Sequence, residues 1–434
     1  MTETVGVVGL GYVGIPLAVV FAEEGYDVVG YDVDTEKVAA LDAGVDPTGE
    51  IAVDALVDGD ARFTTDTAAF ADADYVIVTV PTPVDDRNQP DLGHVEAAGR
   101  SVGPYLAPGA TVVLESTVYP GATEDVLVPA LEESSGLECG TDFHVGYSPE
   151  RSAAGDSAPG LREVVKVVSG LDDVASRRIA GLYDDVIDAG VYEAPDVRTA
   201  EAAKLVENVQ RDVNIALVNE LAMAFDHMGL DTGAVLDTAG TKWNFHRYDP
   251  GLVGGHCIPV DPYYFVHYAE RHGFTPRLTL AGREVNTSVA DHVVDVTTRE
   301  LAESVASGER ALADGDRPRV LVLGVTFKPD VADTRTSGVD RIVDGLQDAG
   351  VEVVAYDPHV PRETVHEEYG VVAQTDFDPA GFEAVVVAAA HSAFDDIDPD
   401  AVASALAPPR FVLDVDGGLD HAWRETDGLT YRRL

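Results

Sequence analysis

A glycine-rich turn near the N-terminus constrains the fold of this chain more than any other feature. The apolar run Val5–Val8 leads into the turn Gly9–Gly14, whose sequence is GLGYVG, and an apolar helical pattern follows as far as Gly25. A second apolar run then ends at Asp32, eighteen residues after the last glycine of the turn. A strand, a glycine-rich turn, a helix and an acid at the next strand end are the pattern of a dinucleotide-binding βαβ unit.

Each glycine of this turn has its own mechanical role. Gly9 allows the tight turn, Gly11 lets a pyrophosphate approach the backbone, and Gly14 lets the helix pack closely on the strand. The amides of Tyr12 and Val13 then lie at the N-terminus of the helix, where the helix dipole favours a phosphate group. We therefore assign these five residues to cofactor binding.

The acid at the end of the second strand selects the cofactor. Asp32 is expected to accept hydrogen bonds from the hydroxyls of the adenosine ribose, whereas a 2′-phosphate would meet this carboxylate and the nearby Asp34. The pattern therefore favours NAD over NADP. The alternative is a glycine-rich turn in an α/β domain that binds no dinucleotide, and it is disfavoured because strand, helix and acid occur together.

The remaining chain divides into three parts. Apolar strands alternate with helical patterns over the first part, which indicates a doubly wound parallel sheet. From Val197 to Met228 apolar residues recur every four positions without Gly or Pro, which predicts one long helix, and a second helix is expected from about Leu278 to Ser307. The last part repeats the strand–helix–strand pattern and ends its second strand at Asp357, but it lacks the triple-glycine turn.

We therefore predict an α/β protein with two Rossmann-like, doubly wound domains joined by a central helical domain that contains the long helix. The predicted boundaries are 1–196 for the NAD-binding domain, 197–312 for the helical domain and 313–434 for the second α/β domain. The polar segment 313–316 is interpreted as a linker.

The charge of the chain excludes several classes of partner. Its 77 acidic residues against 29 basic ones give a net charge of −48, which disfavours binding to nucleic acid or to anionic membranes. Only five basic residues are lysines, a composition that resembles proteins adapted to molar salt, where repulsion is screened. No segment has the length of an apolar membrane span, no signal-peptide pattern precedes Val5, and two cysteines are too few for a disulfide framework, so we expect a cytoplasmic protein.

Three further segments carry residues suited to catalysis. Cys257 lies in a glycine-rich turn, and Pro259 is compatible with a helix that begins just after it and whose dipole would stabilise a nucleophilic thiolate. Lys204 and Asn208 are four residues apart on the long helix and share one face, where an ammonium and an amide can stabilise an oxyanion. Glu150 places a carboxylate just beyond the last strands of the first domain.

Each of these residues also has an ordinary structural interpretation. A lone cysteine such as Cys257 is more often a small buried apolar residue. Lys204 could pair with Glu201 or Glu207 on its own helix. Metal binding by Cys257 and the adjacent His256 is not expected, because the chain has no partner residues at the spacing of a metal site.

Seven short stretches, distributed over nearly the whole chain, carry a resemblance to one family. They are Gly9–Gly14, Val80–Pro83, Glu115–Val118, Ser148–Arg151, Lys204–Asn208, Gly254–Cys257 with Asp261, and Gly324–Lys328 with Asp333–Arg335. Together they resemble the UDP-glucose/GDP-mannose dehydrogenase family of nucleotide-sugar 6-dehydrogenases. The three-part architecture is also that of the family, whose middle helices form a dimer interface, so the resemblance implies a homodimer or a higher homo-oligomer.

The resemblance implies a four-electron oxidation of the C6 alcohol of a UDP-sugar to a carboxylate, with two NAD⁺ used in one site. Cys257 would attack the intermediate aldehyde to form a thiohemiacetal, and water would hydrolyse the thioester that follows. Lys204 and Asn208 would hold the C6 oxygen through its anionic states. A thiol is needed because the aldehyde must become an adduct that still carries a hydride.

The resemblance also assigns the remaining site residues. Asp261 would act with a bound water as a base, and Glu150 and Thr117 would handle protons and water. Thr82 and Arg335 would contact the cofactor. The substrate would be bound by Glu150, Arg151, Lys204, Lys328 and Arg247, the last resembling an arginine that the family supplies from the neighbouring subunit.

Departures from the family pattern bear on the substrate. Ala154 stands where UDP-glucose enzymes commonly carry a second glutamate. The runs Gly146–Arg151 and Gly254–Pro262 look more like members that act on UDP-N-acetylhexosamines. In Asp414–Gly417 the chain lacks an arginine that many relatives have, which leaves one contact to the nucleotide or sugar open.

The sequence therefore predicts an NAD-dependent 6-dehydrogenase of UDP-N-acetylmannosamine or UDP-N-acetylglucosamine, with a product destined for surface polysaccharide. UDP-glucose 6-dehydrogenase is the closest alternative, with the same chemistry and a different pocket. A two-electron hydroxyacid dehydrogenase is disfavoured because it has no use for Cys257. An NAD-binding scaffold without activity would have no reason to hold Cys257, Lys204, Asn208 and Asp261 together.

Overall fold

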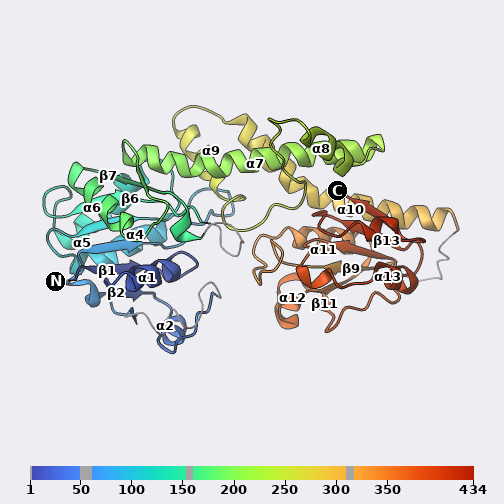
Figure 1. Cartoon of the computed structure of the whole chain (residues 1–434), viewed down its shortest axis with the longest axis horizontal. Helices are drawn as coiled ribbons and strands as arrows, with labels where there is room; N and C mark the ends of the chain where they lie inside the picture. The colour runs from blue at the N-terminus through green and yellow to red at the C-terminus, as the bar shows by residue number, and fades with distance from the viewer. Residues whose placement is uncertain (1, 49–60, 153–159, 309–316) are drawn as a thin grey trace. The chain divides into compact units, whose positions relative to one another are not determined.

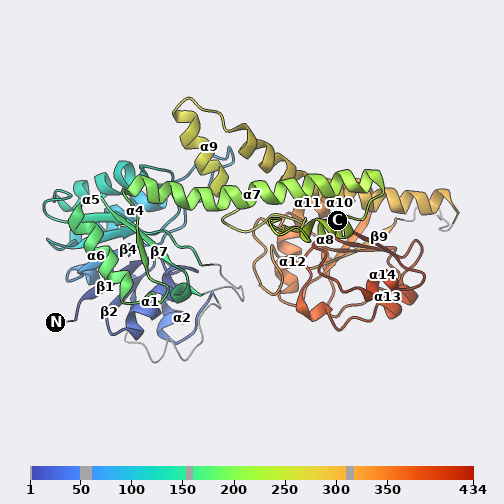
Figure 2. The same ribbon diagram turned by 45° about the horizontal axis from the view of Figure 1, so that its top comes forward.

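The computed structural model describes residues 2–48, 61–152, 160–308 and 317–434 (Figures 1 and 2). The chain forms two compact units, each built around its own sheet. The N-terminal unit consists of Met1–Glu207 and Tyr263–Thr275, and the C-terminal unit consists of Asn208–Pro262 and Pro276–Leu434.

The described part of the N-terminal unit contains an eight-stranded sheet with the order β3-β2-β1-β4-β5-β6-β7-β8. Its strands are β1 (Thr4–Val8), β2 (Asp27–Tyr31), β3 (Arg62–Thr64), β4 (Tyr75–Val78), β5 (Thr111–Leu114), β6 (His144–Tyr147), β7 (Lys166–Gly170) and β8 (Val191–Glu193). Neighbouring strands are parallel except β6 and β7, which are antiparallel. The strand order reverses at β1, so the glycine-rich turn lies at the switch point where such sheets bind their ligands.

The helices of this unit follow its strands as the sequence pattern predicts. They are α1 (Gly14–Glu23), α2 (Thr35–Asp42), α4 (Gly93–Val102), α5 (Val128–Ser135) and α6 (Asp173–Asp184), with short 3₁₀ segments at Thr67–Phe70, Gly103–Tyr105 and Leu161–Glu163 and a π segment at Thr123–Leu127. Aspartates fix two of the helix starts. Asp34 caps α2 and Asp172 caps α6 by accepting backbone N–H groups of the first turn.

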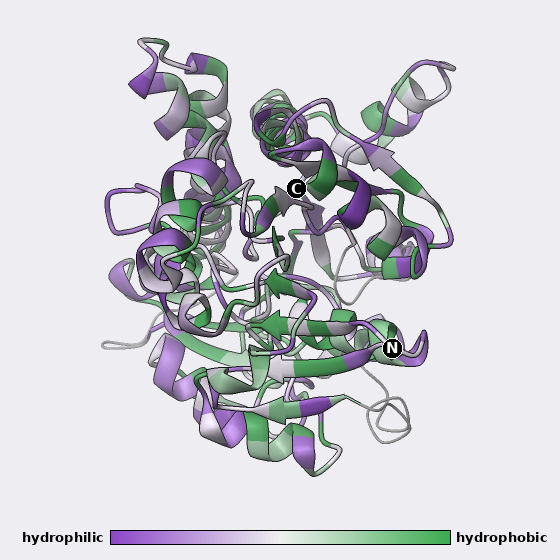
Figure 3. Ribbon diagram, turned by 90° about the vertical axis from the view of Figure 1, so that its left-hand side faces the viewer, coloured by the Kyte–Doolittle hydropathy of each residue, from purple (hydrophilic) through white to green (hydrophobic). Residues whose placement is uncertain are grey.

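Buried apolar strands form the core of the N-terminal unit. Val5 and Val7 of β1, Ile77 of β4 and Val113 of β5 are each fully buried in one cluster. These strands are mainly hydrophobic along their length, as the green colouring in Figure 3 shows. Continuous apolar strands are typical of a parallel sheet that is covered on both faces.

The long helix predicted from Val197 to Met228 is confirmed as α7 (Val197–Met228), which has 32 residues. The second predicted helix is confirmed as α10 (Arg277–Ala306). Between them lie α8 (Thr232–Gly240) and α9 (Asp261–Arg271). In the part of the chain that the structure describes, no helix is both long and apolar enough to cross a membrane.

The C-terminal unit contains a six-stranded parallel sheet with the order β11-β10-β9-β12-β13-β14 among its described residues. Its strands are β9 (Arg319–Leu323), β10 (Glu352–Tyr356), β11 (Val372–Ala373), β12 (Ala384–Val387), β13 (Phe411–Asp414) and β14 (Thr430–Arg433). Its helices are α11 (Val339–Asp348), α12 (Arg362–Tyr369), α13 (Pro399–Ala405) and α14 (Ala422–Glu425), with a 3₁₀ segment at Ser392–Phe394. Alternate residues of β9 enter two different apolar clusters, Val320 on one face and Leu321 on the other.

The two sheets share one topology. The order β3-β2-β1-β4-β5-β6 in the first unit corresponds to β11-β10-β9-β12-β13-β14 in the second. This confirms the prediction of two Rossmann-like domains with a long helix in the middle of the chain. The predicted boundary at residues 312/313 and the predicted linker over 313–316 lie outside the described residues, and the division into three domains stays a prediction.

Candidate active site

The glycine-rich turn has the shape that a bound dinucleotide requires. Gly9 has a φ of +97°, which other residues rarely adopt, and a Cβ on Gly14 would overlap the Gly9 carbonyl oxygen. A Cβ on Gly11 would meet no protein atom within 4 Å, so the space beside this backbone is open. The three glycines therefore fit the turn, approach and packing roles assigned to them for NAD.

Asp32 is held in the orientation needed for a ribose acceptor. Its Oδ2 accepts the Leu10 N–H and the Lys37 ammonium, each over 2.8 Å, and its Oδ1 accepts the Asp34 N–H over 3.0 Å. Burial raises the pKa of Asp32, but the hydrogen bonds from Lys37 and from the two backbone donors outweigh it and lower the pKa overall. Asp32 is therefore ionised at neutral pH. Lys37 was missed in the sequence, although a lysine five residues after this acid is a readable signal.

Thr82 and Thr117 lie in the loops that follow the neighbouring strands β4 and β5. The Tyr264 hydroxyl donates to the Thr82 carbonyl over 3.0 Å, and the Ser116 hydroxyl donates to the Val80 carbonyl over 2.6 Å. These bonds tie the two loops to each other and to α9. Because the carboxyl ends of parallel strands meet at one edge, both threonines share the sheet edge of the glycine-rich turn.

Glu150 follows β6 and lies within a buried group of charges. Its Oε2 is 3.1 Å from the Lys166 ammonium, and its backbone carbonyl accepts the Lys204 ammonium over 2.7 Å. Burial raises the pKa of Glu150, but Lys166 and the donors of Ser152 lower it to about 2. The structure thus brings Lys204 and Glu150 together. Lys166 was not predicted from the sequence, although it is a lysine directly before two valines at the head of a buried strand, and such a residue signals a buried partner.

The alternative pairing of Lys204 with Glu201 or Glu207 is not what the structure shows. The carboxylate of Glu201 is bonded to Thr123, and that of Glu207 pairs with Arg151 over 2.7 Å. The Arg151 guanidinium also donates to the Val165 carbonyl over 2.7 Å. Two nitrogens of the Arg151 guanidinium thus have partners within the first unit, and substrate binding by this residue stays a prediction.

In the C-terminal unit, Cys257, Asp261 and Asn208 lie together. The Asp261 N–H donates to the Cys257 carbonyl over 2.9 Å, and the Asn208 side-chain amide donates to Asp261 Oδ2 over 2.5 Å. Helix α9 begins at Asp261, four residues after the cysteine, rather than immediately after it. Cys257 is exposed, so its interpretation as a buried apolar residue is wrong.

The other cysteine of the chain has a different environment. Cys139 is only partly exposed, and burial together with the nearby Glu132 and Asp172 raises the pKa of its thiol to about 11. A thiol with this pKa is almost entirely protonated at neutral pH and is a poor nucleophile. Of the two, Cys257 is the one accessible to a substrate.

The loop that carries Cys257 packs against the loop that follows β9. Thr336 donates its hydroxyl to the Gly255 carbonyl over 2.6 Å, and a Cβ on Gly254 would lie 2.7 Å from the Phe327 side chain. The second loop also carries Lys328 and Arg335, which are therefore on the same side of this unit as Cys257. A close approach of two backbones explains why Gly254 must be glycine.

Arg335 and Arg247 are each paired with acids of the C-terminal unit. Arg335 makes a two-fold contact with Asp333, over 2.9 and 2.7 Å, and Arg335 and His256 together lower the pKa of Asp333 against the effect of burial. Arg247 pairs with Asp237 and with Asp249, the latter over 3.1 Å. The predicted site residues thus form two sets, one in each unit.

The segment Asp414–Gly417, which lacks the arginine expected from the resemblance, has an arginine beside it. A Cβ on Gly417 would overlap the guanidinium of Arg433, which comes from β14. Asp414 is fully buried and accepts the Tyr431 hydroxyl over 2.8 Å, so it fixes the loop rather than pointing into solvent. The departure seen in the sequence is therefore accompanied by a cation from a neighbouring strand.

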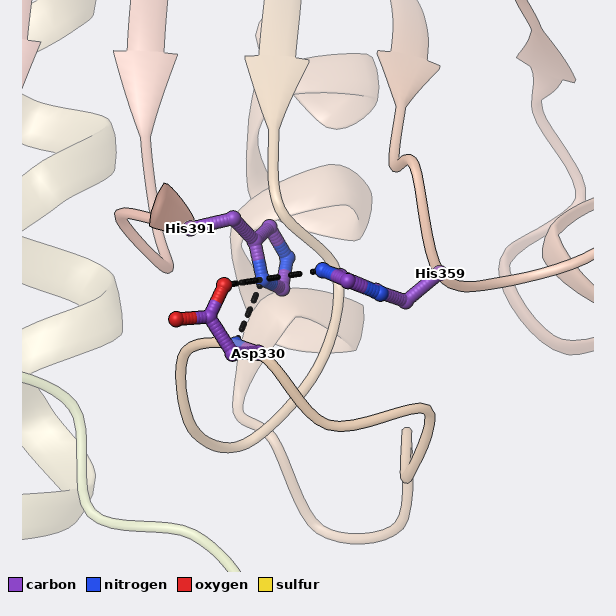
Figure 4. A group of neighbouring side chains, drawn as sticks. All are labelled: Asp330, His359 and His391. Atoms are coloured by element: carbon purple, nitrogen blue, oxygen red, sulfur yellow. Dashed lines mark hydrogen bonds and ion pairs between the residues drawn. The ribbon is translucent and has the colours of Figure 1, made fainter. Parts of the chain in front are cut away.

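A cluster of Asp330, His359 and His391 has the spacing of a metal site, and dashed lines in Figure 4 join Asp330 to each of the two histidines. Its ligand atoms are already bonded within the protein. His391 Nδ1 accepts the Asp330 N–H over 2.8 Å, so its Nε2 carries the proton and donates to Asp357 over 3.0 Å. Asp330 Oδ1 accepts both the N–H and the hydroxyl of Ser392. The cluster fixes a loop and has no free lone pair on His391 for a metal.

Comparison with known families matches almost the whole chain. Residues 3–187 match the NAD binding domain, residues 198–288 the central domain and residues 321–421 the UDP binding domain of the UDP-glucose/GDP-mannose dehydrogenase family. The first and third matches fall on the two Rossmann-like sheets.

Individual relatives agree with this match. The chain is 43% identical to a UDP-N-acetyl-D-glucosamine 6-dehydrogenase of Pseudomonas aeruginosa over 90% of this chain and 91% of that protein. It is 31% identical to a UDP-N-acetyl-D-mannosamine dehydrogenase of Pyrococcus horikoshii over 95% and 94% of the two chains. The solved structure of a UDP-D-ManNAc dehydrogenase from Pyrococcus horikoshii superposes with a TM-score of 0.87 at 28% identity, covering 100% of this chain and 99% of that one.

Proposed function

This chain belongs to the UDP-glucose/GDP-mannose dehydrogenase family and is an NAD-dependent nucleotide-sugar dehydrogenase, and from this premise we propose that it oxidises the C6 alcohol of a UDP-N-acetylhexosamine to the carboxylate. The observation that carries the proposal is the exposed Cys257 next to the hydrogen-bonded pair of Asn208 and Asp261. A two-electron oxidation of an alcohol has no use for a thiol, whereas oxidation of the aldehyde to the acid needs an adduct that still carries a hydride, and a thiol supplies such an adduct.

The residues of the first unit fit NAD. The cofactor would lie with its pyrophosphate over Gly11 and the amides of Tyr12 and Val13, and with its adenosine ribose on Asp32. NAD, when bound there, supplies the hydride acceptor for each of the two oxidations.

Cys257 provides the covalent step. Its thiolate adds to the aldehyde carbon of the half-oxidised sugar and forms a carbon–sulfur bond, which leaves a hydride on that carbon for the second oxidation. The resulting thioester is hydrolysed by water, which breaks the carbon–sulfur bond and returns the thiol. Asp261 acts with a bound water as the base.

Lys204 and Asn208 are suited to hold the reacting oxygen. Lysine has three N–H donors, and Lys204 uses one of them on the Glu150 carbonyl, which fixes the ammonium in place. The amide of Asn208 is fixed by its bond to Asp261. Donors held before the reaction stabilise an oxyanion without a cost of reorganisation.

Glu150 is suited to the hydrolytic step. A carboxyl whose pKa is lowered to about 2 is ionised at neutral pH, so it can accept a hydrogen bond from the attacking water and cannot serve as an acid. Thr117 would orient that water. This step consumes the thioester and releases the uronate.

The acetamido sugar is favoured by the similarity to the Pseudomonas aeruginosa enzyme, whose name specifies UDP-N-acetyl-D-glucosamine. UDP-N-acetylmannosamine is the other hexosamine of the proposal, and UDP-glucose is the alternative. The test is a panel of the three UDP-sugars with NAD⁺ in molar KCl, with NADH and sugar acid measured for each. Two NADH per hexosamine consumed is expected. A ratio near one NADH per sugar consumed would indicate a two-electron oxidation, as in a hydroxyacid dehydrogenase. The absence of NADH with every sugar would indicate an NAD-binding scaffold without activity.

We also propose a homodimer formed through the central helices. Leu217 and Leu221 lie one turn apart on α7, and their exposures are 56% and 37%. An apolar helix stripe left open in the monomer is typical of an interface. Light scattering should give twice the 45.9 kDa chain mass, and Leu217→Glu should give the monomer. Adaptation to high salt stays a proposal from the acidic, lysine-poor composition, and a cytoplasmic location stays the expectation stated from the sequence.

A further inference from the structure

Lys166 places a buried ammonium between two glutamates. Its Nζ lies 2.9 Å from Glu115 Oε2 and 3.1 Å from Glu150 Oε2. The side chains of Lys166 and Glu115 are 3% and 0% exposed, and that of Glu150 is 15% exposed. The reaction proposed above uses Glu150 and gives no role to the lysine.

Glu115 and Tyr183 hold the ammonium from one side. The Tyr183 hydroxyl donates to Glu115 Oε1, so both oxygens of Glu115 are occupied, and the ammonium also lies 5.0 Å from the centre of the Tyr183 ring. Burial raises the pKa of Glu115 and of Tyr183. With the ammonium held in the interior by Glu115 and the Tyr183 ring, Lys166 directs another of its three N–H donors at Glu150.

The Glu150 carboxylate is held at both oxygens. Its Oε1 accepts the N–H groups of Arg151 and Ser152, and its Oε2 accepts Lys166. The neighbouring cations act elsewhere, because Lys204 binds the Glu150 carbonyl and the Arg151 guanidinium pairs with Glu207. Among the described residues, Lys166 is thus the cation that forms an ion pair with the Glu150 carboxylate.

We propose that Lys166 is a positioning residue that keeps the Glu150 carboxylate ionised and correctly oriented for thioester hydrolysis. The proposal rests on the proposed role of Glu150 in that step. Two carboxylates in a buried site tend to share one proton, and a cation between them removes this tendency. A buried ion pair contributes little to stability on balance, because the cost of desolvating the two charges offsets their attraction.

The first test compares Lys166→Met with Lys166→Arg. We expect Lys166→Met to move the acidic limb of the kcat–pH profile upward by about 1–3 pH units, the effect of removing a close opposite charge. The KM values for NAD⁺ and the UDP-sugar should change less than twofold, and the thioester on Cys257 should accumulate in intact-mass spectra. Lys166→Arg retains the charge and should restore the acidic limb. An unchanged limb in Lys166→Met overturns the proposal.

The second test asks whether Lys166 acts through Glu150. In a Glu150→Gln background, adding Lys166→Met should cause no further loss of kcat, because the group on which the lysine acts is absent. A further loss as large as that in the wild-type background would mean a general structural role and would overturn the proposal.

The third test covers the case in which Lys166→Met fails to fold. The double variant Lys166→Met/Glu115→Gln keeps the net charge of the cluster unchanged, because one cation and one anion are removed together. Its acidic limb should also move upward. If both variants are stable and both keep the wild-type limb, the proposal is wrong.

A titration without turnover separates this proposal from the proposed function. Glutamate labelled with ¹³C at the carboxyl carbon gives a resonance for Glu150, assigned by its loss in Glu150→Gln. Its midpoint should rise in Lys166→Met even if the wild type oxidises no UDP-sugar, an outcome that refutes the proposed function alone. An unchanged midpoint with active wild-type enzyme refutes the role of Lys166 alone.

Discussion

The backbone N–H of Val325 donates to Asp357 Oδ2 over 2.8 Å. The same bond, of the same length, joins Leu10 to Asp32 in the first sheet. In each case the donor comes directly after a glycine with positive φ that follows the first strand of the unit. The acceptor is the residue that directly follows the second strand. The two Rossmann-like sheets therefore share not only strand order but also the contact that shapes a dinucleotide site.

The side chain that contacts the aspartate differs between the two units. Asp32 faces Lys37, which is 27% exposed, whereas Asp357 faces the fully buried ring of His391. A ribose could reach the first acid by displacing an accessible lysine, but the second acid is already bonded inside the core. This explains in physical terms why the second unit, which also lacks the triple-glycine turn, offers no place for a dinucleotide ribose.

His391→Phe should destabilise the C-terminal unit. The change keeps an aromatic ring but leaves the Asp330 N–H without its acceptor and removes one of the donors to Asp357, whose backbone donors remain. This loss costs about 1–3 kcal/mol of unfolding free energy. His359→Phe is the matched control, because that ring is 35% exposed and lies 3.5 Å from Asp330. It should change stability by less than about 0.5 kcal/mol. Urea unfolding of both variants measures the difference, and equal losses would contradict the assigned bonds.

The loop held by His391 also carries Lys328, whose carbonyl accepts the Thr326 hydroxyl over 2.8 Å. If Lys328 contacts the substrate, a loosened loop should raise the KM for the UDP-sugar more than the KM for NAD⁺. A rise in both KM values by the same factor would mean that the effect of the variant is not confined to this loop.

The sequence was sufficient for features that depend on local pattern. The bounds of α7 and the glycine-rich turn follow from spacing within a few residues, because helix periodicity and turn chemistry are local. The bonds from Lys166 to Glu115 and from His391 to Asp357 were not predicted. They join residues 51 and 34 positions apart, and only the order of strands in the sheet decides which strand ends meet.

Gly11→Ala and Gly14→Ala should fail in different ways. A methyl group at position 11 meets no protein atom but occupies the space of the pyrophosphate, so this variant should unfold as the wild type does and bind NAD at least about tenfold more weakly. A methyl group at position 14 overlaps the Gly9 carbonyl and should lower stability by about 1–3 kcal/mol.

Gly181→Ala serves as the control for both glycine variants. Gly181 lies in α6, and a Cβ there meets nothing within 4 Å, so alanine should keep NAD binding and leave stability equal or higher. Calorimetry for NAD and thermal unfolding distinguish the three variants. Normal NAD affinity in Gly11→Ala would contradict the cofactor site.

Cys257→Ala should bind NAD and the UDP-sugar but form no uronate, because no thioester can form. Cys139→Ala is the matched control in the same chain, and it should retain activity since the pKa of that thiol is raised to about 11. Iodoacetamide at neutral pH should label Cys257 and leave Cys139 unlabelled. Uronate production by Cys257→Ala at the wild-type rate would refute the covalent mechanism.

Glu201 should make stability depend on pH near neutrality. It is fully buried, and burial raises its pKa to about 7 despite the hydrogen bonds it accepts from Thr123 and Gly121. Because the folded state keeps a proton that the unfolded chain releases, this contribution is fully present below about pH 4.5 and is lost as the pH rises through about 7. The loss amounts to about 3 kcal/mol across the window.

Unfolding free energies at several pH values measure the contribution of Glu201 to stability. The wild type should lose more stability between pH 5 and pH 8 than Glu201→Gln, which cannot titrate there. Glu207→Gln is the control on the same helix and should follow the wild type, since its carboxylate is 38% exposed and paired with Arg151. Parallel curves for the wild type and Glu201→Gln would show that Glu201 is ionised throughout.

The net charge of −48 should make stability depend on salt, and the form of that dependence identifies the cause. Repulsion among exposed carboxylates is screened as the Debye length falls from about 10 Å at 0.1 M to about 3 Å at 1 M. Thermal unfolding in KCl should therefore shift upward mainly below about 1 M. Strengthened apolar burial would instead give a shift that keeps growing with concentration and is larger in sulfate. If the unfolding temperature rises by the same amount for each added molar of KCl from 0.1 to 3 M, the effect comes from apolar burial and not from screening of charge.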